Sequence, residues 1–330
     1  MLRRLLLLAI AATALRAAPP AEPYAVASLL ATWHDDTRDR DIPVKIYYPE
    51  AGAAPAPGRF PVIVFSHGLG GTREGYAYLG QAWAAHGYVS VHVQHLGSDD
   101  GAYRGTLRPL RKMRAAIADP ENAINRPLDI RFAIDRLFAL ADDPAFPLRG
   151  HLDLAHLGVA GHSFGAYTAM AIAGQTYAPG SGESISRPDP RVSAVIAMST
   201  PTPARVLQAG SFDAVAVPVF HLTGTLDEVK ILGQGSDTAI NRRIPYDRTT
   251  HAPAYLLTFE GGDHMVFSGR LVPRAHDLDF QHLVVEGSDA FWDGYLKGDK
   301  AALGYLQGGD FAAAVGALGV FEEKNLPAAR

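Results

Sequence analysis

A serine flanked by glycines is the residue of this chain best placed to act as a nucleophile. Gly161-His162-Ser163-Phe164-Gly165 has the pattern G-x-S-x-G, in which a sharp strand-to-helix turn raises the serine hydroxyl above the edge of a sheet. An apolar run, Leu157–Ala160, precedes it, and an alanine-rich stretch follows. Side chains at the two glycines would collide with the neighbouring strand and helix. The alternative is an ordinary glycine-rich turn, but the flanking stretches favour catalysis by Ser163.

A histidine and a carboxylate are needed to activate such a serine, because a neutral imidazole must accept the hydroxyl proton and an acid must orient the ring. The chain order that goes with this motif is serine, acid, histidine. His264 follows the last predicted strand and is the expected base, the alternative being a solvated loop histidine. Asp227 follows the strand before it and is the expected acid, with Glu228 as its nearest rival. Asp263 is next to His264 in sequence, and adjacent side chains seldom point together.

A second glycine-rich turn could stabilise the oxygen anion of a tetrahedral intermediate. Such an anion needs two fixed N–H donors, one from the residue after the nucleophile and one from the turn after an earlier strand. The first is Phe164. The second turn is Phe65-Ser66-His67-Gly68-Leu69-Gly70-Gly71, and we expect Leu69 to be its donor.

These residues must be held by a sheet, and the sequence alternates apolar runs with stretches of helical spacing. The predicted strands are Ala25–Trp33, Ile42–Tyr48, Phe60–Phe65, Tyr88–Val93, Leu157–Ala160, Val192–Met198, Val217–Leu222 and Ala254–Phe259. The predicted helices are Tyr76–His86, Asn125–Leu140, Tyr167–Ala173, Leu283–Leu296 and Phe311–Val320. This alternation predicts an α/β fold, with a mostly parallel sheet covered by helices on both faces. No linker interrupts it, so we expect residues 24–330 to form a single domain.

Several details of this pattern can be checked against the structure. Asn125 is expected to cap its helix, with Pro127 in the first turn. Two stretches, Leu96–Glu121 and Leu226–His251, resemble insertions, and the second is expected to be polar and solvated. Four basic residues form a cluster on a predicted helix, and we interpret them as a solvated face: Arg108, Arg111, Lys112 and Arg114.

The N-terminus and the composition limit where and on what the protein acts. Arg3 and Arg4 followed by the apolar run Leu5–Leu15 and small residues predict a signal peptide over residues 1–18. The run is too short to span a bilayer, which needs about 20 residues, so we expect a periplasmic or secreted protein without a stable membrane anchor. The net charge of −4 gives no reason to expect nucleic acid as a partner.

Metal and cofactor chemistry are not expected. The chain has no cysteine, which excludes a cysteine nucleophile, disulfides and thiolate metal sites. His92 and His95 with Asp99 and Asp100 are better explained by a loop than by a metal site, because zinc needs three or four converging ligands.

With these motifs in place, the sequence resembles the α/β-hydrolase superfamily, and within it the platelet-activating-factor acetylhydrolases and dienelactone-hydrolase-like bacterial esterases. The matching stretches are Phe65–Gly70, Ala84–Tyr88, Leu128–Phe132 and Gly161–Gly165. It is similar, more loosely, to cutinase-like polyester hydrolases. Dienelactone hydrolases use a cysteine nucleophile, which this chain lacks.

This resemblance implies a Ser163–Asp227–His264 triad with oxyanion donors at Leu69 and Phe164. The expected function is hydrolysis of carboxylic esters through an acyl-enzyme, with short acyl chains preferred. The alternatives are a polyester or amide hydrolase on the same triad, or a non-catalytic binding protein on a hydrolase fold.

Overall fold

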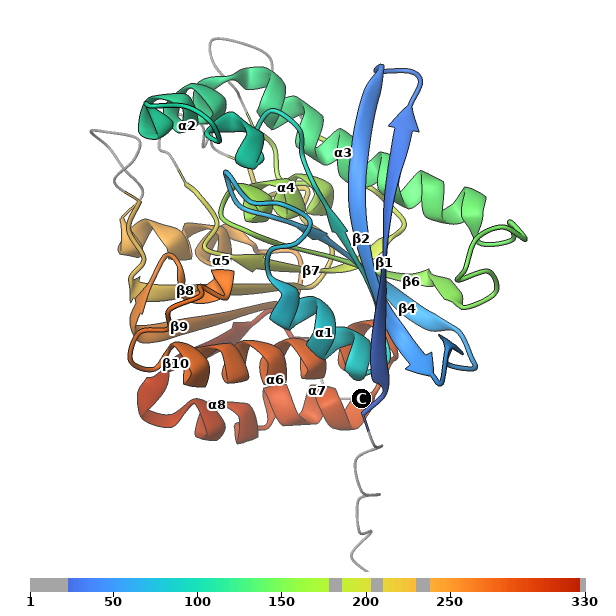
Figure 1. Cartoon of the computed structure of the whole chain (residues 1–330). Coiled ribbons are helices and arrows are strands. Elements are labelled where there is room, and N and C mark those ends of the chain that lie inside the picture. Colours follow the sequence, from blue (N-terminus) through green and yellow to red (C-terminus); the bar gives the residue numbers. More distant parts are fainter. Residues whose placement is uncertain (1–22, 178–185, 203–209, 230–237, 327–330) are drawn as a thin grey trace, which may run out of the picture.

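The computed structural model describes residues 23–177, 186–202, 210–229 and 238–326. The predicted signal peptide, residues 1–18, lies outside the described residues. One sheet runs through the structure (Figure 1). Its strands are β1 (Ala25–Asp35), β2 (Arg40–Ala51), β3 (Ala54–Pro55), β4 (Phe60–Ser66), β5 (Val89–Val93), β6 (Leu152–His162), β7 (Val192–Met198), β8 (Val219–Leu226), β9 (Ala254–Asp263) and β10 (Gly319–Lys324).

The strand order confirms the predicted mostly parallel sheet. It runs β1-β2-β5-β4-β6-β7-β8-β9-β10, with β3 paired to β2. The six strands from β5 to β9 in this order are parallel to one another. The outer pairings β1–β2, β2–β5 and β9–β10 are antiparallel. Because parallel strands share a direction, the carboxyl ends of β4, β6, β7, β8 and β9 lie at one edge, where ligands bind in open sheets of this kind.

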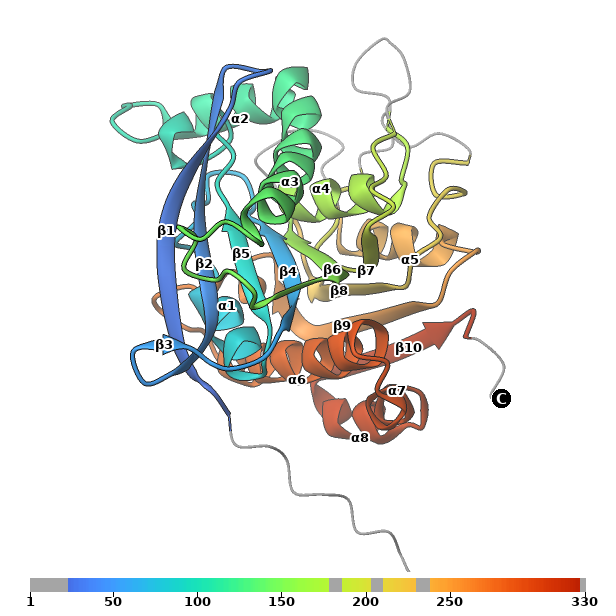
Figure 2. The same ribbon diagram turned by 90° about the vertical axis from the view of Figure 1, so that its right-hand side faces the viewer.

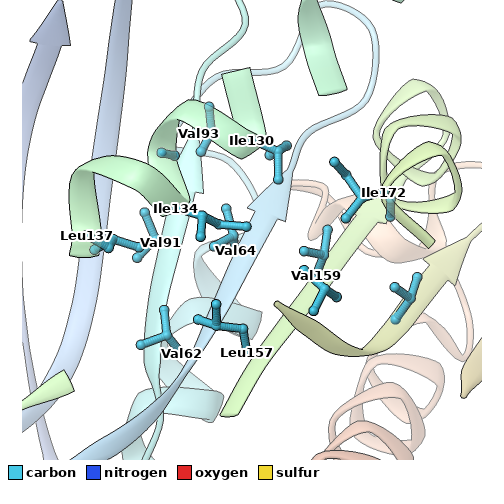
Figure 3. Close-up of a cluster of buried hydrophobic side chains, with 14 of the residues drawn as sticks. Val62, Val64, Val91, Val93, Ile130, Ile134, Leu137, Leu157, Val159 and Ile172 are labelled. Carbon is cyan, nitrogen blue, oxygen red and sulfur yellow. The ribbon is translucent and has the colours of Figure 1, made fainter. Parts of the chain in front are cut away.

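Helices cover both faces of the sheet, as predicted (Figures 1 and 2). The helices are α1 (Ala77–Ala85), α2 (Pro109–Ala118), α3 (Pro120–Leu140), α4 (Phe164–Ala173), α5 (Ile244–Arg248), α6 (Asp277–Leu296), α7 (Lys300–Gln307) and α8 (Asp310–Val315). Alternate side chains along each strand enter two cores. One packs against α3 and α4, with Val64, Val159 and Ile134 among its members (Figure 3). The other packs against α1, α6 and α8.

The long helix α3 begins earlier than the sequence indicates. Asp119, not Asn125, caps it by accepting a hydrogen bond from the N–H of Glu121, and Pro120 occupies its first turn. Pro127 therefore lies inside the helix. The prediction failed because two prolines seven residues apart, Pro120 and Pro127, are both typical of a helix start, and the earlier one begins the helix.

The predicted helix over Phe311–Val320 is wrong in its second half. Helix α8 ends at Val315, where Gly316 has φ 51°. A single 3-10 turn, Gly316–Leu318, follows, and the chain then forms strand β10, antiparallel to β9. Phe321 packs edge-on against Phe220, with ring centroids 6.0 Å apart, and stacks on Tyr255. Tertiary packing against β8 and β9 thus outweighs the local preference of this short segment.

The stretch Leu96–Glu121 is largely helical. It contains a 3-10 helix, Asp100–Ala102, followed by α2 and the start of α3. The four basic residues from Arg108 to Arg114 are exposed on and beside α2. Within the described ranges, no helix has both the length and the apolar character that crossing a membrane requires.

A buried cluster of charges joins the start of the sheet to α3. Asp129 is fully buried and accepts hydrogen bonds from Arg38 at 2.8 Å, Arg40 at 2.9 Å and His95 Nδ1 at 3.0 Å. Burial alone would raise the pKa of Asp129, but the bonds from His95 and Arg40 hold that pKa at about 2. The ionised carboxylate therefore links β2, α3 and the loop after β5.

Replacing Asp129 with Asn should destabilise the fold by about 3–5 kcal/mol at pH 7, because the change removes the buried anion with which the partly buried Arg38 and Arg40 pair. The pKa of Asp129 is lower in the folded than in the unfolded chain, where it is about 3.9. The stabilisation of the fold by ionised Asp129 is therefore fully present above the unfolded-state pKa and is lost as the pH falls toward 2. Urea unfolding at pH 7 and pH 3 measures both effects.

The matched control is Asp135→Asn, the same chemical change on the exposed side of α3, where Asp135 pairs with Arg191. This variant should stay within about 1 kcal/mol of the wild type. Two results would contradict the role given to Asp129. One is an equal loss of unfolding free energy in the two variants. The other is a difference in unfolding free energy between Asp129→Asn and wild type that is as large at pH 3 as at pH 7.

Candidate active site

Ser163 lies on the turn between β6 and α4. Its backbone has φ 55° and ψ −117°, a region that a residue with a side chain rarely adopts. Its N–H donates to the carbonyl of Met198 at 2.9 Å, and α4 begins at the next residue. The strand, the strained turn and the helix therefore hold the Ser163 hydroxyl at the carboxyl edge of the sheet, as the motif predicts.

The two glycines of the motif permit a close backbone approach. A Cβ on Gly161 would overlap the carbonyl of Gly165, and a Cβ on Gly165 would overlap the carbonyl of Ser66 at the end of β4. The first turn of α4 thus packs directly on the backbone that begins the second glycine-rich turn.

His264 reaches Ser163 from the loop after β9. Its Nε2 lies 2.9 Å from Ser163 Oγ and its Nδ1 lies 2.8 Å from Asp227 Oδ1. With Nδ1 donating to the carboxylate, Nε2 is free to accept the serine proton. The other histidines that follow Asp227 in the chain are exposed and have no bond to Ser163 among the described residues: His251, His276 and His282.

Asp227 is the carboxylate that the structure brings to His264. It is fully buried, whereas Glu228 is exposed. Burial would raise the pKa of Asp227, but the hydrogen bond from His264 and the charge of Arg242 hold this pKa below its usual value. Asp263 points elsewhere and pairs with Arg270 at 2.6 Å. Asp227 is therefore an anion at neutral pH, in position to orient His264 and to stabilise its protonated form.

Two hydroxyl groups that sequence reasoning missed complete the surroundings of Asp227. Ser199 Oγ donates to Asp227 Oδ1 at 2.9 Å and lies 2.7 Å from His264 Nδ1. Thr223 Oγ1 donates to Asp227 Oδ2 at 2.9 Å. Both residues lie at the carboxyl ends of predicted strands, which was the available signal. Their hydroxyls hold the carboxylate in one orientation.

The insertion Leu226–His251 is not wholly solvated, contrary to the sequence prediction. Its 3-10 helix, Ala239–Arg243, carries Arg242, which is 2% exposed. Arg242 Nε lies 3.5 Å from Asp227 Oδ1, and its NH1 group donates to the carbonyl of Ser199 at 3.1 Å. Nothing in the sequence of this segment marks Arg242 as buried. Its burial depends on Asp227, which lies outside the 3-10 helix that carries Arg242.

His162 connects the three parts of the site. Its Nε2 donates to the carbonyl of His264 at 2.9 Å, so its Nδ1 accepts from the Tyr76 hydroxyl at 2.7 Å. That hydroxyl accepts from the Gly68 N–H at 3.3 Å. Burial and the nearby His264 lower the pKa of His162 to about 3. The ring is therefore neutral at physiological pH, and this tautomer fixes the His264 loop against the second glycine-rich turn.

Most N–H groups of that turn are occupied. Gly68 donates to Tyr76, Gly70 to the carbonyl of Ser98 at 2.8 Å, and Gly71 to the carbonyl of Gly68 at 3.0 Å. The N–H of Leu69 makes no such bond to any residue that the structure describes, and neither does the N–H of Phe164. These two groups remain available as the donors that the sequence predicts.

His92 and His95, whose spacing could suggest a metal site, have other partners. His95 Nε2 lies 2.9 Å from Ser66 Oγ, while its Nδ1 bonds Asp129. His92 Nε2 lies 3.1 Å from Ser90 Oγ. In the described part of the chain, no three His, Cys, Asp or Glu residues are grouped so that they could hold a metal ion.

The known proteins to which this chain is similar are hydrolases by name. Residues 43–111 match the family model of platelet-activating factor acetylhydrolase, isoform II. A putative phospholipase A2 of Schizosaccharomyces pombe is 28% identical over 176 residues, covering 41% of this chain and 40% of that protein. The platelet-activating factor acetylhydrolase of Bos taurus is 27% identical over 140 residues, covering 34% of this chain and 31% of that protein. The matched part thus spans less than half the length of these relatives.

Replacing Gly165 with Ala should destabilise the protein by more than about 3 kcal/mol, because a Cβ cannot fit against the Ser66 carbonyl without moving the backbone. Gly304→Ala is the matched control, since nothing lies within 4 Å of a Cβ on this helical glycine; it should be neutral or stabilising by up to about 1 kcal/mol. Thermal unfolding distinguishes the two. Equal midpoints would mean that the approach of α4 to β4 is not as close as described.

Proposed function

We propose that this α/β hydrolase, which resembles the platelet-activating-factor acetylhydrolases, cleaves carboxylic esters with Ser163 as nucleophile, His264 as base and Asp227 as the orienting acid. The observation that carries the proposal is the continuous hydrogen-bonded chain from Ser163 Oγ through His264 to the buried carboxylate of Asp227. Such a chain is the geometric signature of a serine hydrolase. A non-catalytic binding protein would have no need of a strained serine aligned with a base.

The reaction follows from this geometry. Ser163 Oγ attacks the ester carbonyl carbon while His264 Nε2 accepts the hydroxyl proton. The carbonyl oxygen becomes an anion, which accepts hydrogen bonds from the N–H groups of Leu69 and Phe164. When the intermediate collapses, the alcohol leaves with the proton from His264, and an acyl-enzyme remains. Water, deprotonated by His264, then attacks the acyl carbon, and the acid is released with Ser163 restored.

A short acyl group is the substrate we propose. Two of the similar proteins are acetylhydrolases by name, and an acetyl group is the shortest common acyl chain. Ester cleavage is also consistent with the name of the phospholipase A2 relative. We further propose export to the periplasm or beyond, supported by the signal-peptide pattern of residues 1–18.

A second candidate is hydrolysis at an apolar surface, either a lipid aggregate or a polyester. Exposed apolar side chains lie at the end of β8 and in the segments that follow β5, β8 and β9 along the chain. They are Leu107, Leu110, Leu226, Ile240, Met265, Leu271, Val272 and Leu278. Exposed apolar side chains that gather into a patch favour contact with an apolar phase, which is what this candidate requires.

Ser163→Ala should abolish ester hydrolysis and leave the fold intact, because the loss of a serine nucleophile lowers turnover by about 10⁴ to 10⁶. Labelling with a fluorophosphonate, detected by intact mass, should occur on Ser163 of the wild type and be absent from this variant. Ser199→Ala is the control: it removes a hydroxyl beside Asp227 but leaves the nucleophile, so labelling should persist. An active or labelled Ser163→Ala protein would end the proposal.

The acyl preference is tested with p-nitrophenyl esters from acetyl to palmitoyl, read as kcat/KM below the concentration at which each ester aggregates. We expect the optimum at acetyl or butyryl. The same series above aggregation, together with a polyester film, tests the second candidate. A rate that jumps at the interface, or an optimum at long chains, would favour the apolar-surface reaction over the short-chain one.

A further inference from the structure

Arg126 is a buried cation between the two turns of the candidate active site. It lies on α3 and is 0% exposed. Among the described residues no carboxylate lies within ion-pair distance of it, and every acceptor of its hydrogen bonds is neutral. Burial lowers the pKa of Arg126 to about 9, so it stays charged at neutral pH. Burying a guanidinium without an ion-paired anion is costly. The hydrogen bonds that Arg126 donates identify the two segments that it holds in place.

One side of the guanidinium holds the turn that contains Leu69. Its NH2 group donates to Ser66 Oγ at 3.1 Å and to the carbonyl of His67. Its NH1 group donates to Ser98 Oγ at 2.8 Å, and the carbonyl of Ser98 accepts the N–H of Gly70. The backbone is thus fixed on both sides of Leu69.

The other side holds the start of α4. Arg126 Nε donates to Thr168 Oγ1 at 3.1 Å, and that hydroxyl donates to the carbonyl of Phe164 at 2.9 Å. The guanidinium carbon also lies 4.5 Å from the centroid of the Phe164 ring. One side chain is therefore bonded to both segments that carry the free N–H groups.

We infer that Arg126 is a positioning residue that sets the distance and angle between the N–H groups of Leu69 and Phe164, so that both donate to the oxygen anion of the transition state. The inference rests on the proposed ester hydrolysis. Hydrogen bonds weaken steeply when their geometry departs from the optimum, and one donor to such an anion changes turnover by about 10²- to 10³-fold. The planar fork of an arginine holds several acceptors in fixed directions, whereas the ammonium group of a lysine is a compact charge on a flexible stem.

The test compares kcat and KM for p-nitrophenyl acetate with the Ki of a trifluoromethyl ketone. The active-site serine adds to this ketone, and the resulting oxygen anion occupies the place of the transition-state anion. Arg126→Lys and Arg126→Met should both lower kcat by about 10- to 100-fold, as expected for weakened anion donors, with KM little changed. The Ki should rise by the factor by which kcat/KM falls. Rates are taken per active site titrated with a fluorophosphonate, so that a misfolded fraction does not count.

Thr168→Val keeps the test possible if the Arg126 variants do not fold. It removes the hydroxyl that joins Arg126 to Phe164 and should show a smaller loss with the same link to Ki, whereas Thr168→Ser should retain activity. Arg131→Met is the control on the same helix. The Arg131 side chain is 42% exposed and its Nε lies 3.8 Å from Asp189, so this substitution should leave kcat, KM and Ki unchanged.

Two outcomes would overturn the inference while leaving ester hydrolysis in place. If the active fraction of the variants falls but kcat per site and the Ki stay at wild-type values, Arg126 only stabilises the fold. If Arg126→Lys is fully active, the charge suffices and the positioning claim is wrong. An inactive wild type would instead remove the proposed function itself.

Discussion

The site depends on one contact between two pieces of backbone, in which the first turn of α4 lies against the end of β4 with no side chain between them. Gly165 faces the carbonyl of Ser66, and Gly161 faces the carbonyl of Gly165. Because of this contact, the turn that carries Ser163 and the turn that carries Leu69 form one rigid unit. Every later element of the site is arranged around that unit: α3 supplies the cation of Arg126 behind it, and the loops after β8 and β9 supply Asp227 and His264 in front.

Two buried charges of opposite sign flank this unit, and each is stabilised differently. Asp227 is surrounded by an imidazole, two hydroxyls and the guanidinium of Arg242. Arg126 has only neutral acceptors among the described residues. Charges in a low-dielectric interior act strongly at short range. In the proposed reaction, the proton that moves from Ser163 to His264 would pass between an anion that favours the imidazolium and a cation behind the segments that carry the Leu69 and Phe164 N–H groups.

The sequence was most informative where function constrains a local segment. Strand, turn and helix around Ser163 follow from one short motif, and chain order identified Asp227 and His264, which the structure brings together. The sequence failed where a role depends on distant partners. Arg126 and Arg242 have no local signature, because each is defined by contacts with elements far away in the chain, and the position of Ser199 after a strand does not by itself identify its partner. The C-terminal strand was missed for the same reason, since only packing against β9 makes that segment extended.

Strand β10 also has a consequence for the biosynthesis of the protein. Before β10 pairs with β9, the backbone donors and acceptors of β9 form an open sheet edge beside Tyr255 and Leu257, and an apolar open edge is a template for joining other chains. The strand that covers it bears Glu322, Glu323 and Lys324, charges that discourage further pairing. Because helices α6, α7 and α8 separate β10 from β9 along the chain, this edge of β9 stays uncovered during synthesis until β10 has also been made.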